Sequence, residues 1–168
     1  MVFAHIPAGY VLAHILVKRN RWPKILLWVG MLGGTFPDID ILYGQYIAKD
    51  FAGHRLYLTH FPSVWILIAA IVLTITILAD RRDWMRAWAV FFSAAFLHIV
   101  LDWVVGDIFI FAPFSWKIFN LIPPPPGQYG WWLLNHITNP AFFLEIAIVI
   151  TAAIIFFRGG YKDLFGAE

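Results

Sequence analysis

Five long apolar stretches, separated by short polar connectors, constrain the fold of this chain more than any other feature. They cover residues 2–17, 25–46, 61–79, 87–111 and 140–157. A helix needs about 20 mostly apolar residues to cross the hydrocarbon core of a bilayer. The chain is 61% hydrophobic and 13% charged, whereas soluble domains are nearer ~45–50% and ~25%. We therefore expect an all-α, polytopic membrane helical bundle of about five transmembrane helices, with residues 1–168 forming a single domain.

Two of these stretches differ from a regular membrane-spanning helix. The first is short, and the second contains Gly33, Gly34 and Pro37. Glycine and proline are tolerated in membrane helices where neighbouring helices or a cavity satisfy the backbone. Both stretches therefore stay in the expected bundle.

The basic residues are unevenly distributed over the connectors, and this predicts an orientation. One set of connectors contains Lys18, Arg19, Arg21, Lys24, Arg81, Arg82, Arg86, Arg158 and Lys162. The connectors on the other side contain Lys49, Arg55 and Lys117. Because basic connectors stay in the cytoplasm, we expect an N-out, C-in topology in the cell membrane. The outer loops then lie near residues 47–60 and 112–139.

Several other classes of protein and site are excluded by composition. The chain has no cysteine, which excludes disulfides, cysteine-type zinc sites and thiol catalysis. No basic cluster interleaves with aromatic residues in a polar region, so we expect no nucleic-acid partner. The N-terminus lacks the charge and cleavage pattern of a removable signal peptide. The proline run at residues 123–126 predicts a stiff spacer or lid in the second outer loop.

Ionisable residues form five short motifs within or beside the apolar stretches. The motifs are His5-Ile-Pro-Ala-Gly9, Pro37-Asp38-Ile-Asp40, His54-Arg55, Thr59-His60 and His98-Ile-Val-Leu-Asp102. A buried charge in a membrane is costly unless it has a partner, so such residues are functional candidates by default. The motifs together predict one buried site.

The depth of the ionisable residues supports a single site. His5, Asp38, His98, Asp102 and Glu145 lie 12–16 residues from the basic residue at the cytoplasmic end of their stretch. At ~1.5 Å per residue this is roughly 18–24 Å, in a core about 30 Å thick. Four different helices thus place acids or histidines at one level, in the outer half of the membrane.

The spacing within the motifs indicates which side chains share a face. His98 and Asp102 are four residues apart, so they lie on one helical face and can reach a common ion. Asp38 and Asp40 are two apart and would diverge on a regular helix. The Gly-Gly-Thr-Phe-Pro run before them breaks that regularity and allows both carboxylates to turn inward.

The remaining histidines and one arginine are expected to complete the site or to lie apart from it. The first outer loop contains His54, Arg55 and His60. This loop would fold back over the depth at which the ionisable residues of the helices lie. His14 lies near the cytoplasmic surface, where an interhelical hydrogen bond explains it best. His136 is expected at the outer polar interface.

Histidine and aspartate ligands without cysteine are compatible with zinc, manganese or iron. Zinc is the first expectation, because mixed sets of this kind are typical of hydrolytic zinc sites with an open position. The predicted ligands are His5, Asp38, Asp40, His54, His60, His98 and Asp102. Seven ligands exceed the needs of one tetrahedral ion, and two ions ~3.5–4 Å apart would account for them. One ion and two ions both stay open.

The predicted chemistry is hydrolysis of a phosphoester on a membrane lipid or lipid-linked headgroup. Arg55 is expected to hold the phosphate, since a guanidinium forms bidentate hydrogen bonds to phosphoryl oxygens. Asp40 or Glu145 is expected to act as general base. The site would open toward the extracytoplasmic side.

The ordered set H-x3-G, PDxD, HR-x3-TH and H-x3-D, followed by Pro113-Phe114, resembles the YdjM-like inner-membrane proteins, which are identified as metal-dependent hydrolases. The resemblance covers the chain from His5 to about Phe114. That family is distantly similar to helical zinc-dependent phospholipase C and single-strand-specific zinc nucleases. The usual glycine after the His-Arg pair is Leu56 here. The resemblance implies as ligands His5, Asp38, His54 or His60, His98 and Asp102.

The alternatives to this hypothesis are another enzyme class, a transporter and a structural protein. Type-2 phosphatidic-acid phosphatases also contain H-x3-D, but they need an arginine shortly before that histidine. Here Ser-Ala-Ala-Phe-Leu precedes His98, which excludes them. A proton- or ion-coupled transporter stays an alternative, although the chain shows no internal repeat. A structural membrane protein whose metal joins the helices is a further alternative.

Overall fold

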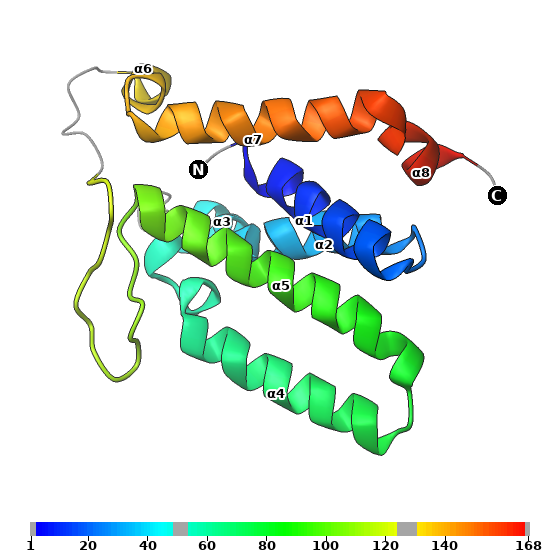
Figure 1. The fold of residues 1–168 in the computed structure, drawn as a ribbon. Helices are drawn as coiled ribbons and strands as arrows, with labels where there is room; N and C mark the ends of the chain where they lie inside the picture. Colours follow the sequence, from blue (N-terminus) through cyan, green and yellow to red (C-terminus); the bar gives the residue numbers. More distant parts are fainter. Residues whose placement is uncertain (1–2, 49–53, 124–130, 167–168) are drawn as a thin grey trace.

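The computed structural model describes residues 3–48, 54–123 and 131–166, and these residues form helices joined by turns and loops, without a β-sheet. Four of the longer helices are α1 (His5–Asn20), α4 (Pro62–Leu78), α5 (Arg82–Val105) and α7 (Ala141–Ile155). Figure 1 shows them side by side in the order α4, α5, α1, α7. The central pair, α1 and α5, positions the site described below.

The pairing of α1 with α2 (Leu26–Thr35) depends on glycine. A Cβ added at Gly9 would overlap the carbonyl oxygen of Gly30, and one at Gly34 would lie 2.6 Å from the carbonyl oxygen of His5. The two backbones are therefore in direct contact, as small residues allow between membrane helices. This contact holds the first turn of α1 against the last turn of α2.

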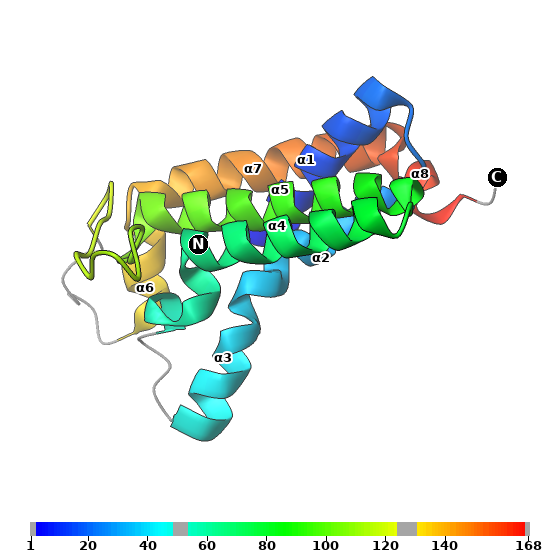
Figure 2. The ribbon, with the colours of Figure 1, turned by 90° about the horizontal axis from the view of Figure 1, so that it is seen from below.

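The second apolar stretch does not continue as one helix. After α2 the chain forms the 3₁₀-helix η1 (Phe36–Ile39), the short α3 (Asp40–Tyr43) and the π-helix η2 (Gly44–Ala48). Pro37 is the second residue of η1, a position at which its missing N–H costs this short helix no hydrogen bond. In Figure 2 this segment projects away from the long helices. The predicted irregularity before Asp38 is thus confirmed.

Two helical segments among the described residues are long and apolar enough to cross a membrane. They are α5 and residues Ala141–Phe165, which combine α7 with η5 (Phe156–Gly160) and α8 (Tyr161–Phe165). The apolar helix α4 is shorter. The all-helical class is confirmed, whereas the five spans and the N-out, C-in orientation stay predictions.

The fourth apolar stretch ends earlier than expected. The helix α5 stops at Val105 rather than near residue 111, because Gly106 has an extended backbone. The chain then turns back on itself, and Ile108 forms an isolated antiparallel bridge with Phe119. Residues 124–130, which hold most of the predicted proline spacer, lie outside the described residues.

Candidate metal centre

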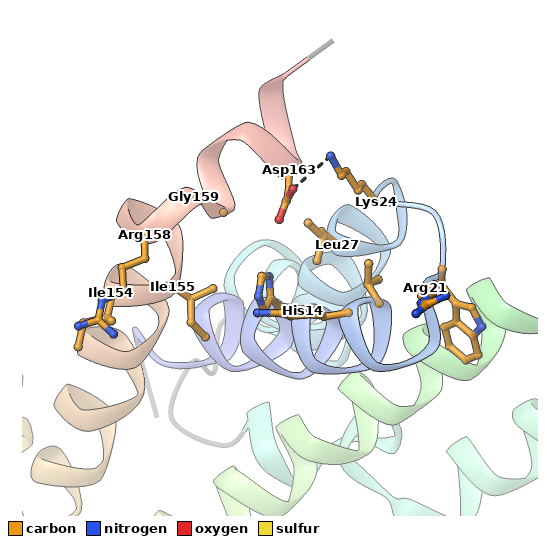
Figure 3. A pocket seen from close by; sticks show the side chains of 13 residues that line it. His14, Arg21, Lys24, Leu27, Ile154, Ile155, Arg158, Gly159 and Asp163 are labelled. Carbon is orange, nitrogen blue, oxygen red and sulfur yellow. Dashed lines mark ion pairs between the residues drawn. The ribbon is translucent and has the colours of Figure 1, made fainter. Parts of the chain in front are cut away.

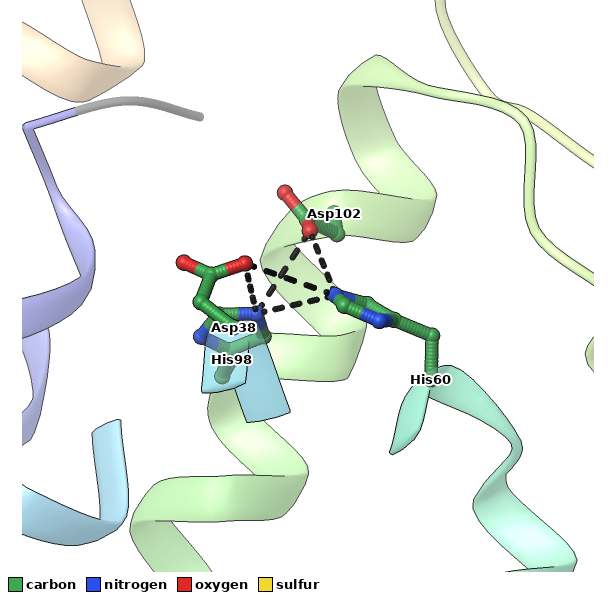
Figure 4. Close-up of side chains that lie close together, drawn as sticks. All are labelled: Asp38, His60, His98 and Asp102. Carbon is green, nitrogen blue, oxygen red and sulfur yellow. Dashed lines mark hydrogen bonds and ion pairs between the residues drawn. The ribbon is translucent and has the colours of Figure 1, made fainter. Parts of the chain in front are cut away.

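Four side chains from three separate segments converge near the end of the bundle where α1 begins and α5 ends. Asp38 comes from η1, His60 from the 3₁₀-helix η4 (Leu58–His60), and His98 and Asp102 from α5. One ligand atom from each lies within 4.8 Å of all the others. Figure 4 shows the two imidazoles and two carboxylates facing one another. The predicted shared face of His98 and Asp102 is confirmed by this arrangement.

Five of the six distances between the four ligand atoms are close to the edges of a tetrahedral zinc site. The Nε2 atoms of His60 and His98 are 3.3 Å apart. Asp38 Oδ1 lies 3.6 and 3.5 Å from these nitrogens, and Asp102 Oδ2 lies 3.4 and 3.5 Å from them. Zinc bonds of ~2.0–2.1 Å to nitrogen and oxygen imply tetrahedral edges of roughly 3.3–3.4 Å. The site therefore has the size that zinc requires.

The Nδ1 atom of each histidine already has a hydrogen-bond partner. His98 Nδ1 donates to the carbonyl oxygen of Gly34 at 2.7 Å, and His60 Nδ1 donates to Asp40 Oδ2 at 2.9 Å. In the neutral imidazoles, both Nε2 atoms then turn lone pairs toward the two carboxylates. Four acceptors facing one another repel unless a cation lies between them.

His60 lies on the connector before α4, and the carboxylates around its ring favour a positive charge there. Burial lowers the pKa of its imidazole, but contacts with Asp102, Asp38 and Asp40 outweigh burial and raise the pKa to about 10. Without a metal, the imidazole of His60 therefore carries a second proton and a positive charge. A divalent cation at the same place would replace that proton.

The comparisons with known proteins agree with a membrane protein. A family model described as YdjM inner membrane protein matches residues 1–161. The chain belongs to this family. Neither the curated proteins nor the solved structures contain a significant match. The YdjM match spans all four converging residues, and the two long apolar helices agree with an inner-membrane location.

In this YdjM-family chain, Asp40 lies behind His60 rather than among the four converging residues. Its side chain is buried and accepts hydrogen bonds from His60 Nδ1 and from Thr59. A carboxylate in this position sets the tautomer and orientation of a metal-binding histidine. The expectation that both carboxylates of the PDxD motif turn to the ion is therefore corrected, because Asp38 and Asp40 lie in consecutive short helices.

His5 lies beside the four residues and contacts the second oxygen of Asp102. Its Nε2 is 3.3 Å from Asp102 Oδ1, and its ring stacks on that of His98 with centroids 3.7 Å apart. His5, predicted at the same membrane depth as His98 and Asp102, thus contacts both side chains. The geometry gives His5 the role of a neighbour that orients Asp102 and His98.

Arg55 joins the connector before α4 to the end of α5. Its Nε lies 3.2 Å from Asp102 Oδ2, and a Cβ added at Gly106 would overlap its Nη1. A cation at this helix C-terminus is stabilised by the helix dipole. The backbone of His54 begins η3 (His54–Leu56), but its side chain, predicted as a ligand, lies outside the described part of the chain.

Glu145 is placed at the start of α1 and not among the converging residues. It accepts hydrogen bonds from the backbone N–H groups of Phe3 and Ala4, and His136 Nε2 lies 2.6 Å from its other oxygen. A carboxylate there satisfies helix N-terminal donors that lack a partner within the helix. This arrangement gives Glu145 and His136 a structural role that joins α1, α6 (Trp132–Ile137) and α7.

Proposed function

We propose that this protein is a metal-dependent hydrolase that cleaves a phosphoester of a membrane lipid or lipid-linked headgroup. The observation that carries the proposal is the set of four ligand atoms within 4.8 Å of one another, with Arg55 beside them. The expected similarity to zinc-dependent phospholipase C and zinc nucleases stays a prediction.

The chemistry of the donor set favours zinc. Two imidazole nitrogens and two carboxylate oxygens without thiolate suit zinc, manganese and iron, and the five edges of 3.3–3.6 Å favour zinc among them. When bound, zinc would lower the pKa of water and polarise the phosphoryl group. Because the four converging atoms can surround one ion, we propose one ion per chain, and water would bind it as a fifth ligand.

The chain's own residues would position the substrate and its ligands. Asp40 and the carbonyl group of Gly34 hold the two imidazoles in place. Arg55 is engaged with Asp102 through Nε, and its terminal N–H groups would bind phosphoryl oxygens. A guanidinium suits that role because its donors match the geometry of a phosphate.

Exposure indicates the side from which a phosphoester would enter. The side chains of His60, His98 and Asp102 are at most 1% exposed, whereas those of Asp38 and Arg55 are 24% and 23% exposed. The substrate would therefore approach between Asp38 and Arg55. The positive-inside pattern of the connectors supports an opening on the extracytoplasmic side.

A metal that only joins helices is the second candidate. The near-complete burial of His60, His98 and Asp102 favours it, because structural zinc sites are closed whereas catalytic sites keep an open position. The partial exposure of Asp38 favours the hydrolase. Activity separates the two, since both candidates predict bound metal.

The proposal is tested by release of the headgroup from phospholipids and of 4-nitrophenolate from bis(4-nitrophenyl) phosphate, using purified protein in detergent. We expect turnover that is lost with chelator and restored by zinc. His98→Ala and Asp102→Asn should abolish it, whereas the matched controls His14→Ala and Asp80→Asn should keep it. Activity that survives chelation, or that is lost equally in the controls, would contradict the metal mechanism.

A further inference from the structure

A cavity lined by several basic residues, here called the basic cavity, lies at the opposite end of the bundle from the four converging residues. It has a volume of about 540 Å³ and is formed by the last turns of α1, the connector before α2 and the residues that follow α7. Figure 3 shows these segments around it. His5 begins α1 and Lys18 lies near its end, so the two sites are roughly 20 Å apart along the helix at ~1.5 Å per residue.

The lining of this basic cavity is strongly cationic. It includes Lys18, Arg21, Lys24 and Arg158, against the single carboxylate of Asp163. Four of the chain's twelve lysines and arginines, but only one of its ten acidic residues, thus face one cavity. The net formal charge of the lining is +3, larger than the +2 of the whole chain. Such a concentration favours an anion.

Two residues with a positive φ line the basic cavity. Arg21 has a left-handed backbone with φ 54°, and Gly159 has φ 129°, a value that favours glycine. Both turns bend the chain around the cavity. Lys24 and Asp163 form an ion pair at 3.2 Å that links the connector before α2 to α8, as the dashed line in Figure 3 shows.

An apolar groove of about 310 Å³ runs toward this cavity between α1, α5 and α7. On α1 the groove includes Ile15 and the cavity includes Lys18, three residues on. On α7 the groove includes Thr151 and the cavity includes Ile155, four residues on. Residues three or four apart share a helical face. The groove and the cavity therefore follow one another along the same two helices.

We propose that the basic cavity and the apolar groove together bind an anionic phospholipid, with its phosphate in the cavity and an acyl chain in the groove. A free phosphate would use the cations alone, whereas the apolar groove along the same two helices favours the lipid. Basic residues at this end also set membrane orientation, but that role does not require them to line one cavity. The proposed lipid site is independent of the proposed hydrolysis.

The test is a lipid titration of the full-length protein in neutral detergent, followed by native mass spectrometry. Dioleoyl phosphatidylglycerol should bind more tightly than dioleoyl phosphatidylcholine. The double variant Lys18→Gln/Arg158→Gln should weaken phosphatidylglycerol binding about 25-fold, at about fivefold for each cation near an anionic headgroup. The matched pair Arg19→Gln/Arg81→Gln removes two charges that do not line the cavity and should stay within about twofold.

Two further arms separate the sources of the anion. Inorganic phosphate should bind far more weakly than phosphatidylglycerol, and Ala147→Phe in the groove should weaken lipid binding. Equal losses in the two double variants would overturn the proposal in favour of diffuse surface charge. Phosphate that displaces the lipid at similar concentration, or an Ala147→Phe variant with unchanged lipid affinity, would overturn the acyl groove. Melting temperatures confirm that each variant is folded.

Discussion

Replacing Asp40 with asparagine tests whether this carboxylate positions His60 or binds the metal itself. Asp40 is 5% exposed and accepts hydrogen bonds from His60 Nδ1, at 2.9 Å, and from Thr59. Asparagine keeps the size and one acceptor but removes the charge. Partners of metal-binding histidines contribute about 10–100-fold to metal affinity, which corresponds to about 1.4–2.7 kcal/mol. We therefore expect Asp40→Asn to raise the zinc Kd by that factor.

The measurement is competition between the purified protein and a chromophoric zinc chelator, with circular dichroism as the check on folding. Asp38→Asn should lose more affinity than Asp40→Asn, because it removes one of the four converging ligand atoms. Asp163→Asn is the matched control, since it lies in the basic cavity and pairs with Lys24. Its zinc affinity should equal that of the wild type.

Two results would refute this reasoning. An Asp40→Asn protein whose zinc affinity stays within twofold of wild type would show that the hydrogen bond to His60 contributes nothing to binding. A loss as large as that of Asp38→Asn would show that Asp40 is itself a ligand.

Three further predictions follow from single contacts. Because the pKa of His60 is raised to about 10, the ring must lose a proton to bind zinc, so apparent affinity should rise about tenfold per pH unit from pH 6 to 8; a flat pH profile would contradict this. Glu145→Gln should lower the free energy of unfolding by about 1–3 kcal/mol without changing zinc affinity. Loss of zinc binding in this variant would show that Glu145 acts at the metal centre. Gly106→Ala should displace Arg55 and slow phosphoester hydrolysis by up to about 100-fold at unchanged zinc content, as measured on one preparation.

The metal-binding face of α5 could be predicted from sequence because helical spacing is regular. His98 and Asp102 are four apart on a helix that is regular around them, so their shared face follows directly. His60 could be assigned only to a loop that folds back, since nothing in its spacing determines the path of the connector. The long-range contact of His60 with α5 depends on packing between segments far apart in sequence.

The roles of Asp38 and Asp40 could not be separated in advance. Both lie in one motif, and which of them faces the ion depends on where η1 ends and α3 begins. Helix boundaries depend on hydrogen bonds that sequence patterns locate only to within a residue or two. The glycine and proline before the motif predict irregular backbone, but not its direction.

Depth along a helix does not determine direction around its axis, and Glu145 shows the consequence. Its level agreed with that of the predicted ligands, yet its side chain meets the start of α1 and His136. A buried carboxylate beside a histidine nine residues earlier is a pairing that a search for local partners could have found. The backbone donors of Phe3 and Ala4 could not be found without the fold.

The central claim is that the four converging acceptor atoms bind one divalent metal ion. Elemental analysis of protein purified without chelator, then equilibrated with zinc and desalted, tests this most directly. We predict one zinc per chain in the wild type and none in the His60→Ala/His98→Ala variant, with His14→Ala retaining the ion. A folded wild-type protein that holds no metal after equilibration, or a double variant that keeps a full equivalent, would contradict the claim.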